Sequence, residues 1–349
     1  MTLPLSLDAL TPQWICSTLS AAQPGWKIED ARIRRVIPGT TTKVLVTVQC
    51  QREGGASESL DLCIKGGFDP ALRPVFGSSY VAEARFYGEV APAVDAPLPR
   101  CWYAAADPDV GQGIIIMDDL AAAGARFGDP SDTWPVERVA AALAVQARWQ
   151  APTWGASPSR FPALVVGSYI RQPAHMLFSQ ENWDRVFADE SHMARMPPAL
   201  RDRRLVHGAL ERLWQHDDAS GIPCLSHADP HVGNTFIDTD GQPGFLDWQS
   251  ASLAPAMDDV AYFLVGAMAV EDRRRHERTL VEGYLDSLQS VLGQSLDGDA
   301  YWRDYQRHCL HGLVWTVVPP ELQPPGYRAL MTERYVTAIL DHESLSLLD

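Results

Sequence analysis

Alternating apolar and polar side chains predict a β-strand at residues 60–65. Leu60, Leu62 and Ile64 share one side of such a strand, and Lys65 lies on the other, because successive side chains of a strand point to opposite faces. Two glycines follow Lys65 and end the pattern. We therefore expect an apolar face that packs on a core and an opposite face that carries a lysine.

Two further segments in the first third of the chain predict strands. Residues 36–46 have the pattern of a strand, a turn and a second strand, with small residues at the turn. Residues 113–117 form an apolar run that ends in two aspartates, as expected for a buried strand that reaches the surface. The first third is therefore expected to be rich in β-structure.

Helix signals dominate the rest of the chain. A hydroxyl or acidic residue followed by proline or by an apolar run is typical of a helix start. We expect such starts at Thr11-Pro12, Ser78-Ser79, Thr133-Trp134-Pro135 and Asp258-Asp259. The helix after Ser79 would span residues 80–90, and the helix after Pro135 would continue to Trp149.

A β-hairpin is predicted around Asp240-Gly241, because this pair between apolar runs is a strong hairpin signal. With a two-residue loop, the pairs count outward from Thr239 opposite Gln242 to Asn234 opposite Asp247. That pair would be non-hydrogen-bonded, with Cα atoms about 4.5 Å apart. The two polar side chains would then share one face.

The strongest chemical signal combines Asp229, Asn234 five residues later and Asp247 eighteen residues after Asp229. A metal-dependent phosphoryl transferase needs a carboxylate that accepts the proton of the attacking hydroxyl. It also needs an amide and a second carboxylate that hold Mg²⁺. A zinc hydrolase site is the alternative, because His227, Asp229 and His231 alternate along one segment, although Pro230 argues against a regular central strand there.

The segment His227-Ala228-Asp229 to Asn234, followed by Leu246-Asp247-Trp248, resembles the aminoglycoside phosphotransferase and choline kinase-like superfamily, including its ecdysteroid kinase-like branch. The resemblance implies a bilobal α+β fold of the protein-kinase type, with a small β-rich lobe and a larger helical lobe. It also implies ATP and Mg²⁺ as cofactors. We expect the lobes to comprise residues 1–117 and 118–349.

The resemblance assigns roles to residues of the second lobe. Asp229 matches the catalytic base, Asn234 and Asp247 match the Mg²⁺ ligands, and His227 matches a histidine that shapes the loop. Asp259 would hydrogen-bond this loop from below. One departure is Ala228, which stands where the family usually has glycine, so the local backbone geometry is the point in question.

The resemblance also implies a nucleotide-binding set in the first lobe. Lys65 would bind phosphates and Glu83, on the following helix, would be its ion-pair partner. The turn at Gly39, Thr40 and Thr41 resembles the nucleotide loop only loosely, and a plain hairpin turn fits it as well. The backbone of Met117 and Asp118 would hydrogen-bond the adenine edge.

Composition narrows the class of partner. The net charge of −15 disfavours nucleic acids and anionic membranes, since both attract basic surfaces. Six scattered cysteines without a Cys-x-x-Cys pair favour reduced thiols and a cytoplasmic location. The apolar run 260–270 is too short to cross a bilayer. We expect a monomer or homodimer.

The expected activity is transfer of the γ-phosphoryl group of ATP to a hydroxyl group of a small molecule, which includes antibiotics and other bulky natural products. A nucleotide-binding protein without transfer activity is the alternative. Aromatic residues near the C-terminus either belong to the core or line an acceptor pocket: Tyr301, Trp302, Tyr305, Trp315 and Tyr327. The Pro-rich segment 319–325 is expected to be a loop near that pocket.

Overall fold

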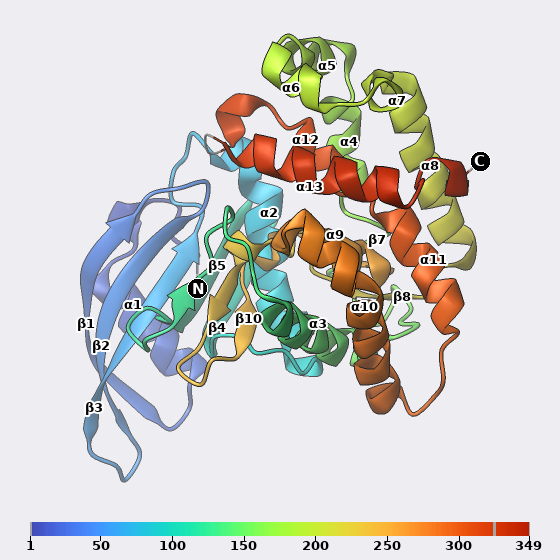
Figure 1. The fold of residues 1–349 in the computed structure, drawn as a ribbon. Helices are drawn as coiled ribbons and strands as arrows, with labels where there is room; N and C mark the ends of the chain where they lie inside the picture. The colour runs from blue at the N-terminus through green and yellow to red at the C-terminus, as the bar shows by residue number, and fades with distance from the viewer. Residues whose placement is uncertain (1, 324–325, 349) are drawn as a thin grey trace.

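The computed structural model describes residues 2–323 and 326–348, which form a small β-rich lobe and a larger helical lobe (Figure 1). This arrangement confirms the expected α+β class. The elements of the small lobe are η1 (Leu7–Ala9), α1 (Pro12–Ala22), β1 (Trp26–Ile37), β2 (Thr42–Arg52), β3 (Ser57–Gly66), α2 (Arg73–Arg85), η2 (Phe86–Val90), η3 (Ala91–Ala93), β4 (Cys101–Asp107) and β5 (Gln112–Asp118). The predicted division at residues 117 and 118 falls at the end of β5 and stays a prediction.

The small lobe is built on a five-stranded sheet in the order β1-β2-β3-β5-β4, with antiparallel neighbours. One face of the sheet packs on α1, whose start is capped by Thr11 as predicted. Alternate side chains of β2, β3 and β5 build this core, including Val46, Leu62 and Ile116. The opposite face is therefore free to border a cleft.

Lys65 lies on that opposite face, as its place in the alternation predicts. It stands opposite Lys43 in β2 and Ile115 in β5. Its side chain is buried although it carries a charge. A buried ammonium group needs ionic partners, and the site described below supplies them.

The helix that follows β3 begins earlier than predicted. α2 begins at Arg73, with Pro74 in its first turn, and Ser78 and Ser79 lie inside it. The expectation that these serines cap the helix was therefore wrong. Proline is compatible with a first helical turn because the N–H that it lacks has no partner there anyway. The serine pair imitates a cap because serine is strongly favoured at helix N-caps and less so inside helices.

The large lobe is mainly helical. Its helices are α3 (Val136–Gln150), α4 (Arg171–Leu177), α5 (Gln180–Phe187), α6 (Glu190–Arg195), α7 (Pro198–Arg201), α8 (Arg203–Ser220), α9 (Met257–Ala267), α10 (Val270–Leu292), α11 (Gly298–His308), α12 (Leu313–Thr316) and α13 (Tyr327–Asp341). Short 3-10 turns are η4 (Ala151–Thr153), η5 (Val232–Asn234), η6 (Trp248–Ser250), η7 (Pro320–Leu322) and η8 (Ser346–Leu348). Two small sheets have the orders β10-β9-β6 and β7-β11-β8. Their strands are β6 (Arg126–Phe127), β7 (Val165–Val166), β8 (Pro223–Ser226), β9 (Thr235–Ile237), β10 (Pro243–Phe245) and β11 (Ser252–Pro255).

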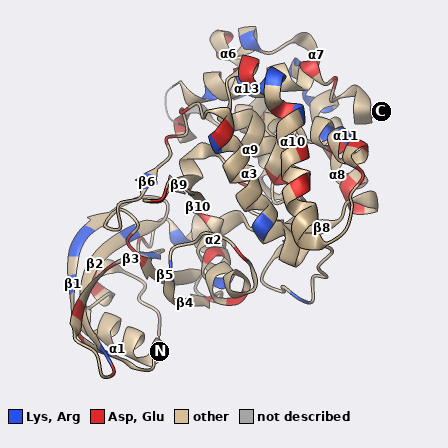
Figure 2. Cartoon of the chain, turned by 60° about the horizontal axis from the view of Figure 1, so that its bottom comes forward, with Lys and Arg blue, Asp and Glu red and all other residues tan. Residues whose placement is uncertain are grey.

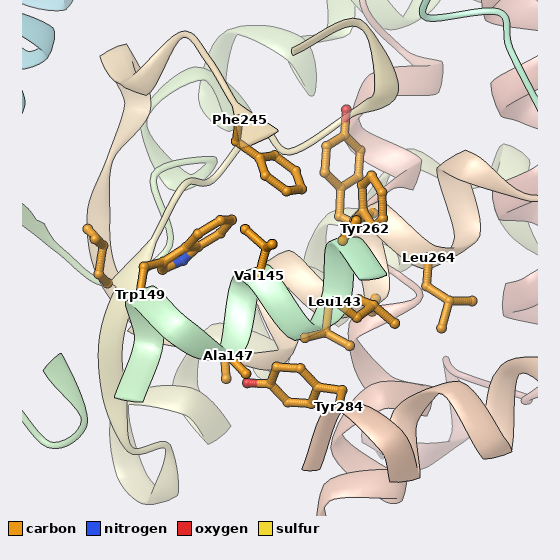
Figure 3. Close-up of a cluster of buried hydrophobic side chains, with 14 of the residues drawn as sticks. Leu143, Val145, Ala147, Trp149, Phe245, Tyr262, Leu264 and Tyr284 are labelled. Carbon is orange, nitrogen blue, oxygen red and sulfur yellow. The ribbon is translucent and has the colours of Figure 1, made fainter. Parts of the chain in front are cut away.

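Helix α3 forms the centre of the large-lobe core (Figure 3). Trp149 at its end packs edge-on against Phe245 of β10 and against Trp248. Trp248 in turn stacks on Phe86, which follows α2. Tyr284 of α10 packs on the other side of α3 (Figure 3). Aromatic packing thereby connects the end of α2 with the segment that carries Asp247.

The predicted hairpin exists, but its register differs by one residue. Ile237 pairs with Pro243, and the N–H of Leu246 donates to the carbonyl of Asn234 over 2.8 Å. Asn234 therefore stands opposite Leu246, and the predicted pairing with Asp247 was wrong. Asp238 pairs with Gln242 and Gly241 has a φ of 83°, so three residues form the loop and the last of them adopts the left-handed conformation.

The remaining expectations concern surface and C-terminal features. Acidic and basic positions are interspersed over both lobes (Figure 2). None of the described helices is both long and apolar enough to span a bilayer. Of the C-terminal aromatic residues, Tyr305 is fully buried in the core, and Trp302 stacks on it. Within the Pro-rich segment, Pro324 and Pro325 lie outside the described residues.

A close approach of α2 to β5 at Gly113 leads to the first prediction. A Cβ atom at Gly113 would lie 1.9 Å from the backbone oxygen of Tyr80 in α2. Gly113→Ala should therefore lower the free energy of unfolding by about 1–3 kcal/mol, because backbone must move to admit the methyl group. Urea denaturation measures the change.

Gly283→Ala is the matched control. Gly283 lies inside α10, and a Cβ atom there meets nothing within 4 Å. The substitution should raise the free energy of unfolding by about 0.5–1 kcal/mol, because alanine favours the helix. Equal effects of the two substitutions would show that α2 and β5 tolerate separation.

Candidate active site

A cavity of about 400 Å³ lies between the sheet and the large lobe. Residues of the small lobe that line it include Lys43, Lys65, Glu83, Met117 and Asp118, and residues of the large lobe include Phe127, Asn234 and Asp247. Six of the residues predicted from the sequence thus border one cavity. They come from β3, α2, the end of β5 and the hairpin, so the fold gathers distant parts of the chain.

Lys65 contacts two carboxylates in this cavity. Its Nζ atom lies 2.7 Å from Glu83 and 2.8 Å from Asp247. Burial lowers the pKa of Lys65, but the charges of Asp247 and Glu83 outweigh it and raise the pKa above its ordinary value. Lys65 therefore stays protonated, and the predicted pairing with Glu83 is present.

Lys43 is a second cation at the cavity that the sequence reasoning did not single out. It stands opposite Lys65 in the register of β2 and β3, and both border the same cavity. The sequence held a signal for this position. Lys43 precedes the buried Val44 in a strand with alternating side chains, so it points to the same face of the sheet as Lys65 in the neighbouring strand. Two ammonium groups at one wall make this part of the cavity suited to phosphate.

One buried carboxylate, that of Asp259, accepts three hydrogen bonds from the loop that carries Asp229. Asp259, near the start of α9, accepts hydrogen bonds from Ser226 Oγ at 2.8 Å, from the N–H of His227 at 2.7 Å and from the N–H of Ala228 at 2.9 Å. Asp259 is fully buried. The three donors would be unsatisfied without it, so this carboxylate determines the path of the loop.

Ala228 adopts the left-handed conformation, with a φ of 67°. Glycine adopts this conformation without strain, whereas alanine is disfavoured there by about 1–2 kcal/mol. Alanine in place of the family's glycine therefore leaves the backbone conformation unchanged but strained. The backbone path is the one that glycine favours, and the bond from Ala228 to Asp259 stabilises it.

Asp229 accepts hydrogen bonds from two side chains, and a third side chain lies nearby. The Nδ2 group of Asn234 donates to Oδ2 of Asp229 over 3.2 Å, and the hydroxyl of Tyr262 donates to Oδ1 over 3.3 Å. His231 Nε2 lies 3.7 Å from Oδ2. The sequence patterns did not point to a role for Tyr262. It follows Asp259 by three residues, however, and therefore shares its face of α9.

Burial and the nearby charge of Asp247 raise the pKa of Asp229 to about 8. A cation beside Asp247 would offset part of this rise and would favour the ionised carboxylate. Asp229 does not border the large cavity but lies on the other side of Asn234. A hydroxyl group reaching Asp229 would therefore approach from the side of Tyr262 and His231.

His227 is enclosed by backbone groups. Nε2 of His227 lies 2.8 Å from the carbonyl of Leu246, and its Nδ1 accepts from the N–H of Asp229 over 3.4 Å. Burial lowers the pKa of His227 to about 4, so it is neutral. Because backbone groups occupy both ring nitrogens, His227 is unsuited to hold zinc together with His231.

Asn234 and Asp247 present oxygen atoms to the cavity. The amide nitrogen of Asn234 donates to Asp229, so its amide oxygen is the free end of the group. Asp247 has a φ of 66°, which turns its carboxylate toward Lys65. An amide oxygen and a carboxylate are the ligands that Mg²⁺ prefers.

Two of the predicted nucleotide-binding segments, the turn at residues 39–41 and the backbone of Asp118, are not placed as expected. Gly39, Thr40 and Thr41 lie in the turn after β1 and do not line the cavity, whereas Ile37 and Lys43 beside the turn do. The N–H of Asp118 already donates to the carbonyl of Arg100 over 3.0 Å. That group is therefore not free for an adenine edge, and the roles of this set stay predictions.

Comparison with known proteins places the chain in a class. The model of the Phosphotransferase enzyme family matches residues 82–294, more than half of the chain. The chain belongs to this family, which supports the expected class of small-molecule phosphotransferases. A search of curated proteins gave no match.

Solved structures with the same fold include three small-molecule kinases. Choline kinase LicA from Streptococcus pneumoniae has 12% identity and a TM-score of 0.51, with 94% of this chain and 98% of that chain covered. An aminoglycoside phosphotransferase from Alicyclobacillus acidocaldarius has 13% identity, a TM-score of 0.51, and coverage of 100% and 96%. The microcompartment-associated aminopropanol kinase has 13% identity, a TM-score of 0.51, and coverage of 96% and 99%. These likenesses confirm the protein-kinase-like fold.

The conformation of Ala228 leads to a stability prediction. Ala228→Gly should raise the free energy of unfolding by about 0.5–1 kcal/mol, because glycine removes the strain of a positive φ, although it adds freedom to the unfolded chain. Thermal and urea unfolding measure the effect.

Ala251→Gly is the control, because Ala251 is also buried in a loop of this lobe but has a φ of −52°. This substitution should lower the stability by about 0.5–1 kcal/mol. A loss of stability in both variants would contradict strain at Ala228.

Proposed function

We propose that this protein transfers the γ-phosphoryl group of ATP to a hydroxyl group of a small molecule. The observation that carries the proposal is the convergence of Lys65, Asn234 and Asp247 on one cavity, with Asp229 held against Asn234. Phosphoryl transfer depends mainly on positioning and on charge stabilisation. Cationic and oxygen-donor side chains that meet in one cavity suit that task.

Each side chain has a separate task in this proposal. Lys65, oriented by Glu83, binds the α- and β-phosphates, and Lys43 adds positive charge at the same wall. Asn234 and Asp247 would hold Mg²⁺, which would neutralise charge on the phosphates. These oxygen donors fit that ion better than they fit zinc or copper.

Asp229 is the proposed general base. Its two oxygens are oriented by Asn234 and Tyr262, which leaves Oδ2 next to His231. Asp229 accepts the proton of the acceptor hydroxyl as the oxygen attacks the γ-phosphorus. Asp259 and His227 act as positioning residues, because they hold the loop and do not border the cavity.

The acceptor is proposed to be a bulky hydroxylated natural product. Aromatic side chains pack on the two residues that border Asp229: Tyr327 is 6.4 Å from His231 between ring centroids, and Trp315 is 6.1 Å from Tyr262. Aromatic faces favour large apolar surfaces over small polar alcohols. Incubation with Mg²⁺–ATP and hydroxylated compounds, read by the mass of a phosphorylated product, identifies the acceptor.

Asp229→Ala should abolish transfer while nucleotide binding persists. Loss of a general base lowers turnover by about 10²–10⁴-fold, whereas Asp229 does not border the cavity. Product formation by mass spectrometry and ATP binding by calorimetry measure the two effects. Loss of ATP binding together with folding stability would instead mark Asp229 as a structural residue.

Asp247→Ala should weaken Mg²⁺–ATP binding by at least about tenfold, which corresponds to about 1.4 kcal/mol. Calorimetric titrations at several Mg²⁺ concentrations measure it. Asp240→Ala is the control, because Asp240 is exposed at the tip of the same hairpin. An unchanged dependence on Mg²⁺ in Asp247→Ala would remove this residue from the ion site.

A further inference from the structure

A second group of polar side chains is buried in the large lobe, away from the cavity. Asp217 of α8, Asp258 of α9 and His308 of α11 each bring one donor atom to a common point, and these atoms all lie within 4.8 Å of one another. The exposed fraction is 6% for Asp217 and 1% for Asp258 and His308. In Figure 1, α9 occupies the centre of this lobe, and α8 and α11 lie toward its right side.

The distances in this group are too long for strong hydrogen bonds. Nε2 of His308 lies 3.3 Å from Oδ1 of Asp217 and 3.3 Å from Oδ1 of Asp258. An N–H group bonded to a carboxylate is usually about 2.7–2.9 Å away, and Nε2 has no hydrogen-bond partner among the described residues. The nitrogen therefore faces the space between the two oxygens.

The other ring nitrogen of His308 fixes its orientation. Nδ1 lies 2.8 Å from the carbonyl oxygen of Asp304. A carbonyl oxygen only accepts, so Nδ1 carries a proton, and in the neutral ring Nε2 offers a lone pair. A histidine that donates one N–H to a carbonyl while its other nitrogen faces carboxylates has the arrangement of a metal ligand.

A further oxygen atom of the group has no partner. Oδ2 of Asp217 is buried without a hydrogen bond among the described residues, whereas a hydrogen bond from Ser168 helps to lower the pKa of Asp258. A buried carboxylate oxygen without a partner is costly. The second ring near the group is His311, whose Nδ1 donates to Oδ1 of Asp258 over 3.2 Å.

We propose that Asp217, Asp258 and His308 bind a divalent metal ion, with zinc as the ion that fits best. Two carboxylates carry two negative charges, which one divalent ion balances. Zinc–nitrogen and zinc–oxygen bonds of about 2.0–2.1 Å in a tetrahedron place neighbouring ligand atoms about 3.3 Å apart. The two nitrogen–oxygen distances above match this value, and an imidazole ligand disfavours Mg²⁺ and Ca²⁺.

The alternative cation is a protonated His308. Burial lowers the pKa of His308, but Asp217 and Asp258 outweigh it and raise the pKa to about 10 in the absence of metal. One imidazolium leaves the pair of carboxylates with a net negative charge, and its Nε2 atom is 3.3 Å from each of them. The metal satisfies the donor atoms more fully.

The ion would act as a structural brace for the active site. Asp258 precedes Asp259, which holds the Asp229 loop. Helices α8, α9 and α11 would be joined at the ion, so the start of α9 would be fixed from behind. The ion would lie outside the phosphoryl-transfer cavity, since none of its ligands borders that cavity.

Metal content of the unmodified protein is the first test. The chain is freed of metal with a chelator, incubated with Zn²⁺ in the presence of excess Mg²⁺, and passed through a gel-filtration column. We expect one equivalent of zinc per chain by elemental analysis and a higher unfolding temperature. Co²⁺ in place of Zn²⁺ should give the visible absorption of a tetrahedral site.

Variants locate the ion. Asp217→Asn keeps the shape of the side chain and should weaken zinc binding by at least about tenfold. His216→Gln is the matched control, because His216 is the neighbouring residue on α8 and pairs with Asp304 at the half-exposed surface. The control should retain one equivalent of zinc.

Three results would overturn the proposal. They are a zinc-treated protein with no bound metal and an unchanged unfolding temperature, a Co²⁺ form without a tetrahedral spectrum, or an Asp217→Asn variant that retains stoichiometric zinc. The first would favour the imidazolium, and the last would favour another site, such as the one around His231. If Asp217→Asn does not fold, the Zn²⁺ and Co²⁺ results on the unmodified chain still decide.

Discussion

The structure depends most on the ammonium group of Lys65, which joins carboxylates from both lobes. Glu83 comes from α2 of the small lobe and Asp247 from the hairpin of the large lobe, at 2.7 and 2.8 Å. Removing either partner would leave buried charge less well compensated, and breaking such a pair is strongly destabilising. The ammonium group also needs the apolar face of β3 to be buried on the other side. The sheet can therefore bury its apolar face only if the ammonium group of Lys65 is placed between the two carboxylates, and the reverse holds as well.

Helix α9 is the second centre of organisation. Three polar residues at its start face different neighbours: Asp259 and Tyr262 contact the Asp229 loop, and Asp258 contacts His308 and His311. Polar groups at the start of a buried helix need partners because they have lost water. The helix therefore connects Asp229, the proposed general base, with the buried cluster behind it, and a shift of α9 would move both.

The sequence predicted those parts of the site that depend on periodicity and on spacing. The pairing of Lys65 with Glu83 was implied by the resemblance to the phosphotransferase family, whereas the face of Lys65 and the hairpin around Gly241 follow from local patterns. The hairpin register does not, because two-residue and three-residue loops both accept Asp-Gly and only the backbone of residues 239–241 decides between them. The contacts of Tyr262 and Lys43 depend on tertiary packing, and both are visible in hindsight as positions that share a face with a predicted residue. The serines at 78 and 79 imitated a cap because serine is strongly favoured at N-caps, but the helix starts earlier, at Arg73 and Pro74.

The shift in register changes how the proposed ion site is built. Direct pairing across a flat ladder would place Asn234 and Asp247 on one face by strand geometry alone. With Leu246 opposite Asn234, Asp247 falls one residue beyond the pair, where a strand would direct its side chain to the opposite face. The left-handed conformation of Asp247 reverses the chain there and returns the carboxylate to the cavity. The same conformation at Ala228, on the loop that carries Asp229, indicates that both carboxylates are aimed by strained backbone and not by a regular ladder. The surrounding hydrogen bonds, from Asp259 on one side and Lys65 on the other, supply the stabilisation that such strain requires.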